Sequence, residues 1–290
     1  MITLWLGVVI LSLASLLMFR RKGHGVSILV PFHCPDEHNQ RAKNWRWLKR
    51  YWECQLPGAE IVVGRDRISE LDSRLPFSKS SAVNDAASRA SGDVFVIVDA
   101  DGYIPADSVM DCVEQIRKAR KKGHRLWFVP YRHFYRLTKE ASQLILQSQP
   151  CDPYQFSCPP PPDCILDTSG SQLGHWYGAG IQIMPREAFE EVGGWDPRFR
   201  GWGGEDHAAM RAVDTLYWRH KTLPGQLLHI WHPMLRPQGT DDWVHWRERV
   251  WANQTSSGAN DELAGKYYGA TGDAKRMRKL VEAGRNFETL

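Results

Sequence analysis

Apolar and polar positions over the first 130 residues follow two periods in turn, one typical of strands and one typical of helices. Short apolar runs at residues 26–32 and 59–64 flank a Trp-rich helical stretch at 44–54, which predicts a strand–helix–strand unit. A Ser-capped helix of small residues is predicted at 78–92. The run at 93–98 is apolar without alternation, so we expect a central strand of a parallel sheet that helices cover.

The alternation of strand and helix patterns continues further along the chain. Residues 106–123 predict a helix with Val109, Val113 and Ile116 on one face, cationic residues in its last turns and Gly123 at its end. Residues 124–131 predict one more strand. This order predicts a doubly wound α/β sheet, in which ligands bind beyond the carboxyl ends of the strands.

The second half of the chain has a weaker pattern. Residues 140–175 are Pro-rich and lack periodicity, so we expect a long surface loop there, placed to cover a site. An apolar strand at 178–185, a short helix at 186–194 and a helix at 207–218 are predicted next. The last fifty residues are polar and helical in character.

The amino terminus differs from the rest of the chain in composition. Residues 1–19 contain no charged side chain and are followed by Arg20, Arg21 and Lys22. This length is near the minimum for a membrane-spanning helix, and the flanks of a cleaved signal peptide, the alternative, are not evident. The positive-inside rule then predicts a single-pass protein whose main domain lies in the cytoplasm. We expect four parts: an anchor at 1–19, a basic linker at 20–25, a catalytic domain at 26–240 and a helical extension at 241–290.

The overall composition is that of an ordinary globular protein, with 42% hydrophobic and 24% charged residues. The formal charge of +4 is spread over short patches and gives no reason to expect a nucleic-acid partner. None of the six cysteines forms a CxxC pair, which favours free thiols in a reducing compartment. Cys151, Cys158 and Cys164 lie close enough in sequence for a disulfide if the domain is exported.

Two carboxylates follow the apolar run, in the segment VIVDADGYIP. Asp99 and Asp101 end a buried strand, the place where a site opens in a doubly wound sheet. Such a pair can hold a hard divalent cation and, through it, the oxygens of a diphosphate. The alternative is an ordinary turn, in which Asp is common.

Residues 193–206, GGWDPRFRGWGGED, form a more specific pattern. Glu205 and Asp206 begin a predicted helix, where the helix dipole favours ionised carboxylates, and an ionised carboxylate can act as a general base. Trp202, flanked by glycines, offers an aromatic face to a sugar ring. The alternative is a Gly-rich turn with a core Trp and an acidic helix start.

The segment LLHIWHP supplies His229 and His232. Histidines near a carboxylate site indicate a mixed nitrogen and oxygen coordination sphere, which suits manganese better than calcium. Alternatively, one of them is a packed histidine at the end of a strand.

These three segments, in this order, resemble those of GT-A-fold glycosyltransferases, in the group that includes the β-1,4-galactosyltransferases and bacterial chondroitin-type polymerases. Residues 26–32 and 76–87 also resemble the nucleotide-binding half of such enzymes, and the likeness covers roughly residues 26–235. The resemblance implies a GT-A (Rossmann-like) doubly wound mixed sheet, Mn²⁺ or Mg²⁺ as the metal, a nucleotide-sugar donor with UDP, and a glycan or other hydroxyl-bearing acceptor.

The resemblance also implies roles for single residues. Asp101 matches the principal metal ligand, His232 the late histidine ligand, and His229 a position where the galactosyltransferases have a methionine ligand. Asp99 would lie nearer the ribose and the donor. Asp206 matches the catalytic base. Two further sets are implied: Trp202 and Glu205 at the acceptor, and Pro31, Lys79, Asn84 and Gly180 around the uridine, the diphosphate and the donor sugar.

The chain departs from the family pattern at His207, where an acidic residue often stands, and in its Pro-rich segment, so donor sugar and acceptor stay open. We expect a metal-dependent inverting glycosyltransferase that moves a hexose or N-acetylhexosamine. Three alternatives remain: a retaining transferase of the polypeptide N-acetylgalactosaminyltransferase type, a non-catalytic carbohydrate-binding membrane protein, and a nucleotidyltransferase. The last leaves the Trp-Gly block unexplained.

Overall fold

The structure, a computed structural model of the 290-residue chain, describes residues 25–34, 36–72, 75–167, 179–201, 203–233 and 260–287. The predicted anchor, most of the basic linker, Trp202 and the predicted boundary at residue 240 lie outside these ranges. Within the ranges, no helix combines the length and the apolar character needed to cross a membrane.

A six-stranded mixed sheet forms the centre of the molecule, in the order β2-β1-β3-β8-β5-β9. Its strands are β1 (Val26–Pro31), β2 (Glu60–Gly64), β3 (Val94–Val98), β5 (Phe128–Val129), β8 (Ile181–Pro185) and β9 (Lys221–Thr222). β1 runs parallel to β2 and β3, whereas β8 runs antiparallel to β3 and β5.

β3 occupies the predicted central position, and all five of its residues are buried. The expectation of a parallel sheet around it is wrong on one side, because β8 enters antiparallel after the chain has crossed a second sheet. The strand predicted at 124–131 is also shorter than expected, since only Phe128–Val129 pair with neighbours.

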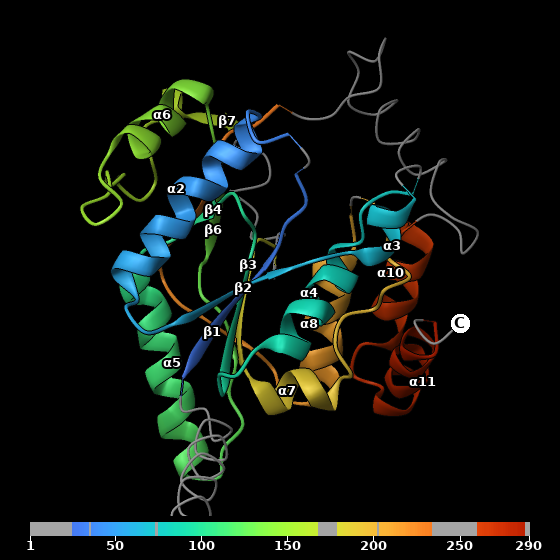
Figure 1. Ribbon diagram of the computed structural model, residues 1–290. Coiled ribbons are helices and arrows are strands. Elements are labelled where there is room, and N and C mark those ends of the chain that lie inside the picture. Colours follow the sequence, from blue (N-terminus) through green and yellow to red (C-terminus); the bar gives the residue numbers. More distant parts are fainter. Residues whose placement is uncertain are drawn as a thin grey trace, which may run out of the picture.

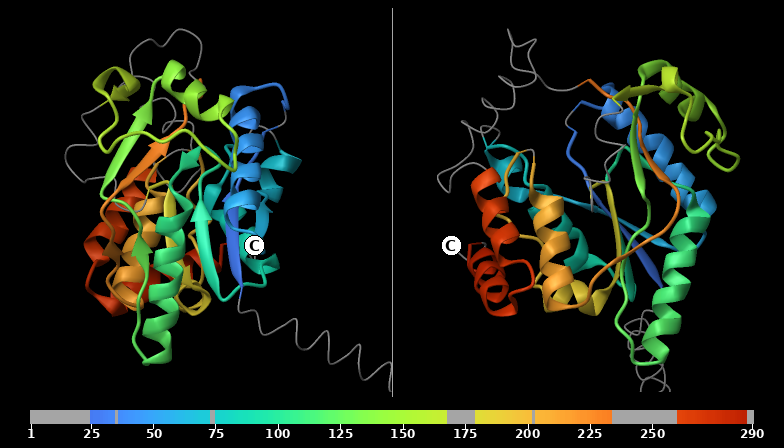
Figure 2. Two further views of the ribbon diagram at one scale, coloured as in Figure 1. Left: turned by 90° about the vertical axis from the view of Figure 1, so that its left-hand side faces the viewer. Right: turned by 180° about the vertical axis from the view of Figure 1, so that it is seen from behind.

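Helices cover both faces of this sheet (Figures 1 and 2), so the α/β class and the doubly wound arrangement are confirmed. One face carries α2 (Gln40–Gln55) and α5 (Ala106–Lys121). The other carries α3 (Arg67–Leu71), α4 (Lys79–Arg89), α7 (Arg186–Glu191) and α8 (Glu205–Leu216). The mixed sheet between two helical layers fits the GT-A arrangement.

Local sequence explains these helices well. The Ser78 hydroxyl caps α4 by accepting a hydrogen bond from Ser81 N at 3.2 Å, as the Ser signal predicted. On α5, Val109, Val113 and Ile116 are buried, which confirms the predicted apolar face. At Gly64 a Cβ atom would lie 1.8 Å from the Ala82 carbonyl oxygen, so only glycine lets β2 approach α4 this closely.

A second sheet of four strands, β4-β10-β6-β7, lies beyond the end of β3 and was not predicted. It comprises β4 (Gly102–Tyr103), β6 (His133–Leu137), β7 (Ile165–Asp167) and β10 (Gln226–His229). These strands have two to five residues, too short for a periodic signal.

The predicted surface loop at 140–175 is wrong over much of its described length. It contains most of α6 (Lys139–Gln147), the 3-10 turn η1 (Pro162–Cys164) and β7. The Thr138 hydroxyl caps α6 by accepting from Ala141 N at 3.1 Å, and Ala141 and Ile145 are buried. The helix has only nine residues, so its apolar periodicity was too short to be recognised next to the Pro-rich segment that follows it.

A disulfide joins Cys54, near the end of α2, to Cys151, 97 residues later. The expectation of free thiols is therefore wrong for these two cysteines, while Cys34, Cys112, Cys158 and Cys164 are free as expected. The turn after α6 folds against α2, where the Gln55 side-chain amide donates to the Cys151 carbonyl at 2.9 Å. Tertiary packing brings the pair together, and sequence spacing gave no sign of it.

The carboxyl-terminal residues form α10 (Asn260–Ala270) and α11 (Ala274–Arg285), which confirms their helical character. Both helices pack beside α8 (Figure 1). The Tyr267 hydroxyl donates to Asp196 Oδ2 at 2.9 Å, and the Asn260 side-chain amide donates to the Arg200 carbonyl at 3.0 Å. They therefore support the segment that leads into α8.

Candidate active site

The turn after β3 links the two sheets and places both carboxylates of the DxD pair. Asp99 N donates to the Gly180 carbonyl at 2.9 Å, and Gly102 N donates to the Asp99 carbonyl at 3.1 Å. β4 then pairs antiparallel with β10, with Gly102 opposite His229. Backbone pairing thus brings residues 101 and 229 together across more than 120 positions of sequence.

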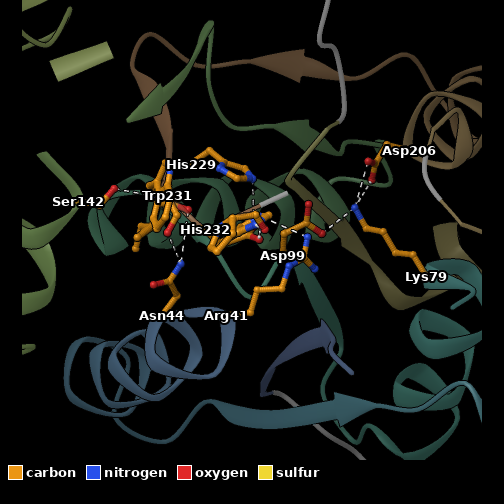
Figure 3. Close-up of polar contacts among 12 residues, drawn as sticks. Arg41, Asn44, Lys79, Asp99, Ser142, Asp206, His229, Trp231 and His232 are labelled. Atoms are coloured by element: carbon orange, nitrogen blue, oxygen red, sulfur yellow. Dashed lines mark hydrogen bonds and ion pairs between the residues drawn. The ribbon is translucent and has the colours of Figure 1, made fainter. Parts of the chain in front are cut away.

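Asp101, His229 and His232 form a candidate metal group, with one ligand atom from each lying within 4.8 Å of the others. The Nε2 atom of His229 lies 3.6 Å from Asp101 Oδ1, and the Nε2 atom of His232 lies 3.2 Å from Asp101 Oδ2 (Figure 3). All three residues predicted as metal ligands therefore meet at one point.

Hydrogen bonds fix which ring nitrogen of His232 is available. Its Nδ1 lies 3.0 Å from the Pro233 carbonyl oxygen, which can only accept, so Nδ1 carries the proton and donates. Nε2 then holds a lone pair that faces the Asp101 carboxylate. The guanidinium of Arg41, 3.2 Å away, donates to this lone pair. His232 Nε2 and Asp101 Oδ2 then both present lone pairs to the same place, which favours a cation between them.

The ionisation states in this group suit metal binding. Burial lowers the pKa of His229 to about 4, against the opposing effect of the Asp101 carboxylate, so the ring is neutral at physiological pH. Burial alone raises the pKa of Asp101, but the protonated forms of His229 and His232 and the Arg41 guanidinium outweigh it and hold that pKa below the ordinary value. The group therefore offers one carboxylate and two imidazole nitrogens.

Lys79 lies in the middle of a second, adjoining cluster (Figure 3). Its Nζ atom is 2.6 Å from Asp99 Oδ1 and 2.8 Å from Asp206 Oδ1, and Glu205 Oε1 lies 4.0 Å away. Burial raises the pKa of Asp206, Lys79 opposes this effect, and Glu205 and Asp99 add to it, so the pKa stands well above the ordinary value. Asp206 is thus a stronger base than an exposed carboxylate.

The glycines before α8 set the direction in which Glu205 and Asp206 enter the site. Gly203 and Gly204 have φ angles of 107° and 91°, which favour glycine. A Cβ at Gly204 would also lie 3.0 Å from Ala264 Cβ. Glu205 is buried, and within the described residues its Oε2 atom has no hydrogen-bond partner. An unpaired buried carboxylate oxygen indicates a place for a ligand hydroxyl.

Two residues that the sequence did not single out hold the chain between the histidines. The Asn44 side-chain amide, on α2, donates to the Trp231 carbonyl at 3.0 Å, and the Ser142 hydroxyl, on α6, accepts from Trp231 N at 2.8 Å (Figure 3). Asn44 is fully buried on a helix face otherwise rich in Trp and Leu. A polar residue on an apolar face was the available signal.

The remaining residues predicted to bind the donor are Gly180, Pro31 and Asn84. Gly180, with φ of 79°, supports Asp99 through its carbonyl. Pro31 ends β1 and is buried. The Asn84 side-chain amide exchanges two hydrogen bonds of 2.8 Å with the backbone of Trp195, so it holds the Gly-rich turn. Trp202 lies outside the described residues, and the donor and acceptor roles stay predictions.

Comparison with known proteins gives two family matches and a distant structural likeness. The family described as the N-terminal domain of galactosyltransferase matches residues 162–228, and glycosyl transferase family 2 matches residues 64–158. No curated protein sequence matches significantly.

Two of the solved structures that are similar to this chain are of Drosophila β1,4-galactosyltransferase 7. The catalytic domain with xylobiose is 15% identical, with a TM-score of 0.37, over 82% of this chain and 83% of that one. A mutant with manganese, UDP-Gal and xylobiose is 14% identical, with a TM-score of 0.37, over 83% and 79%.

The two family matches divide the candidate site between them. The family 2 match contains Lys79, Asp99 and Asp101, and the galactosyltransferase match contains Gly180, Glu205 and Asp206. The structure brings both sets together around one group of buried charges. The two partial family matches and the assembled site thus support a glycosyltransferase that resembles the galactosyltransferases.

Proposed function

We propose that this glycosyltransferase is metal-dependent and inverting, and that it moves a hexose or N-acetylhexosamine from a UDP-sugar to an acceptor hydroxyl. The observation that carries the proposal is the position of Lys79. It joins Asp99, in the DxD turn beside the candidate metal group, to Asp206, the candidate base. The candidate base and the DxD turn are thereby held in one cluster of charged side chains.

The residues present fit a divalent cation. Four carboxylates, Asp99, Asp101, Glu205 and Asp206, face two permanent cations, Lys79 and Arg41, and the described site has an excess of negative charge. One carboxylate and two imidazole nitrogens suit Mn²⁺, with Mg²⁺ as the alternative. Asp101, His229 and His232 would hold such an ion, which would supply positive charge for the departing diphosphate.

Asp206 would act as the general base. Its carboxylate takes the proton of the acceptor hydroxyl as that oxygen bonds to the anomeric carbon, and the bond from this carbon to the diphosphate breaks with its electron pair on the diphosphate. Lys79 favours the ionised form of Asp206 before the acceptor arrives, against the effect of burial. The unpaired Oε2 atom of Glu205 supports a contact with an acceptor hydroxyl, and Trp202 would offer a stacking face to its sugar ring.

Donor turnover with manganese tests this mechanism. We expect Asp101→Ala and Asp206→Asn each to lower transfer or donor hydrolysis by at least about a hundredfold, since each removes a group that acts on the transition state. A screen of nucleotide sugars identifies the donor without knowledge of the acceptor. Undiminished transfer by both variants contradicts the mechanism, and NMR of the anomeric configuration of the product separates inversion from retention.

We further propose that residues 1–19 anchor the protein in a membrane as a single span. The flanking charges support a cytoplasmic domain, whereas the Cys54–Cys151 disulfide supports an oxidising compartment. Protease protection of the domain in intact cells, compared with permeabilised cells, decides between these placements.

A further inference from the structure

Arg41, on the first turn of α2, reaches the candidate metal group although no sequence pattern pointed to it. Its Nη2 atom lies 3.2 Å from His232 Nε2 (Figure 3). A guanidinium only donates, and the other ring nitrogen of His232 already donates to Pro233, so Nε2 accepts through its lone pair. This is the lone pair that a metal ion at Asp101 and His232 needs.

Arg41 also supplies positive charge where the metal would supply it. Asp101 Oδ2 lies 3.2 Å from the same Nε2 atom, so the guanidinium and the carboxylate both face one ring nitrogen. Arginine stays protonated at any pH at which proteins work. One lone pair cannot serve a guanidinium and a metal ion together, so binding at Nε2 requires Arg41 to leave. Arg41 is an exposed residue, so solvent is available to its side chain when it leaves.

We propose that Arg41 is a placeholder cation: it stabilises the ligand-free metal group, is displaced by the divalent ion, and then contacts the diphosphate of the donor. The inference rests on the proposed function, because it takes Asp101, His229 and His232 as the metal ligands. The last step follows from tethering, since the displaced guanidinium stays on α2 beside the ion. Its planar donors suit paired phosphate oxygens.

Two binding measurements on the full chain test the proposal. Manganese affinity is measured from the loss of the free Mn²⁺ EPR signal, and UDP affinity by calorimetry at saturating manganese, both at pH 7.5. In Arg41→Ala we expect manganese to bind about three- to tenfold more tightly, because a competing cation is gone. UDP should bind roughly tenfold more weakly, because a charged phosphate contact is lost.

The matched control is Arg46→Ala on the same helix. Arg46 is exposed and donates to the Glu37 carbonyl at 2.8 Å, away from the metal group. Both affinities should equal those of the wild type. Arg41→Lys keeps the charge but not the planar fork, so its manganese affinity should stay near the wild-type value while UDP binding falls part of the way. Circular dichroism confirms that the variants fold.

The outcomes separate the inference from the proposed function. Unchanged or weaker manganese binding in Arg41→Ala, with normal binding by the wild type, overturns the placeholder role alone. Unchanged UDP binding overturns the diphosphate contact. Absence of manganese binding by the wild type overturns the proposed metal centre, and the inference with it. Opposite changes in the two affinities support the inference, because a structural role for Arg41 would weaken both.

Discussion

Single residues in the site have chemical properties that their positions in the fold create. Lys79 is the clearest case: sequence reasoning assigned it to the donor diphosphate, whereas the structure shows its ammonium bound to Asp99 and Asp206. The ion pair with the candidate base does not exclude a later contact with the diphosphate. It means that Lys79 controls the proton affinity of Asp206 in the ligand-free enzyme.

The pH dependence of activity should report this control. Burial raises the pKa of Asp206, so activity should fall, as pH decreases, at a higher pH than for an ordinary carboxyl base. Lys79 lowers that pKa, and Lys79→Met should therefore move the acidic limb of the kcat/KM profile to still higher pH. Lys49→Met, which removes an exposed ion pair with Glu53, is the control. A limb that stays in place or moves to lower pH contradicts the assignment.

At the level of helices and strands, long elements of the fold hold short segments that have little regular secondary structure of their own. The residues around His229 and His232 form no long strand, yet α2 and α6 bind the backbone between the two rings through Asn44 and Ser142. The pairing of β4 with β10 does the same for Asp101 and His229. The candidate metal group is therefore assembled by four elements from distant parts of the sequence, α2, α6, β4 and β10.

Removal of the Asn44 amide should disturb this assembly. Asn44→Ala leaves the partly buried Trp231 carbonyl without its donor, and we expect a loss of unfolding free energy on the order of 1–3 kcal/mol together with weaker manganese binding. Urea denaturation and the EPR assay measure the two effects. Lys43→Ala, exposed on the same helix, should change neither. Wild-type manganese affinity in a folded Asn44→Ala protein would show that α2 does not position the ligands.

The whole molecule is stabilised by links between its two sheets and their helices. The Cys54–Cys151 disulfide ties the end of α2 to the turn after α6, so the two helices that hold Trp231 are also joined covalently. α10 and α11 support the opposite side, where α8 presents Glu205 and Asp206. The site thus lies between α2 and α6, which the disulfide links, and α8, which α10 and α11 support.

Loss of the disulfide should lower the stability of the whole fold. It closes a long loop, so Cys54→Ser should lose about 2–4 kcal/mol of unfolding free energy in urea without reductant. A reducing agent should lower the stability of the wild type and leave the variant unchanged. Cys158→Ser, at an exposed free thiol, should behave like the wild type in both conditions. Equal stability of the wild type and Cys54→Ser without reductant would show that the bond does not form.

The sequence by itself determined the α/β class, the buried central strand and the helices with clear caps and apolar faces, because each of these depends on residues close together in the chain. The candidate ligands and base came from the resemblance of three sequence segments to a known family. Tertiary structure decided the second sheet, the disulfide, the ion pairs of Lys79 and the contact of Arg41 with His232. These depend on strand pairing and helix packing between distant segments, and local periodicity carries no record of such contacts. The motif VIVDADGYIP predicted a cation site. Only the fold showed that Lys79 contacts Asp99 and that Arg41 contacts His232.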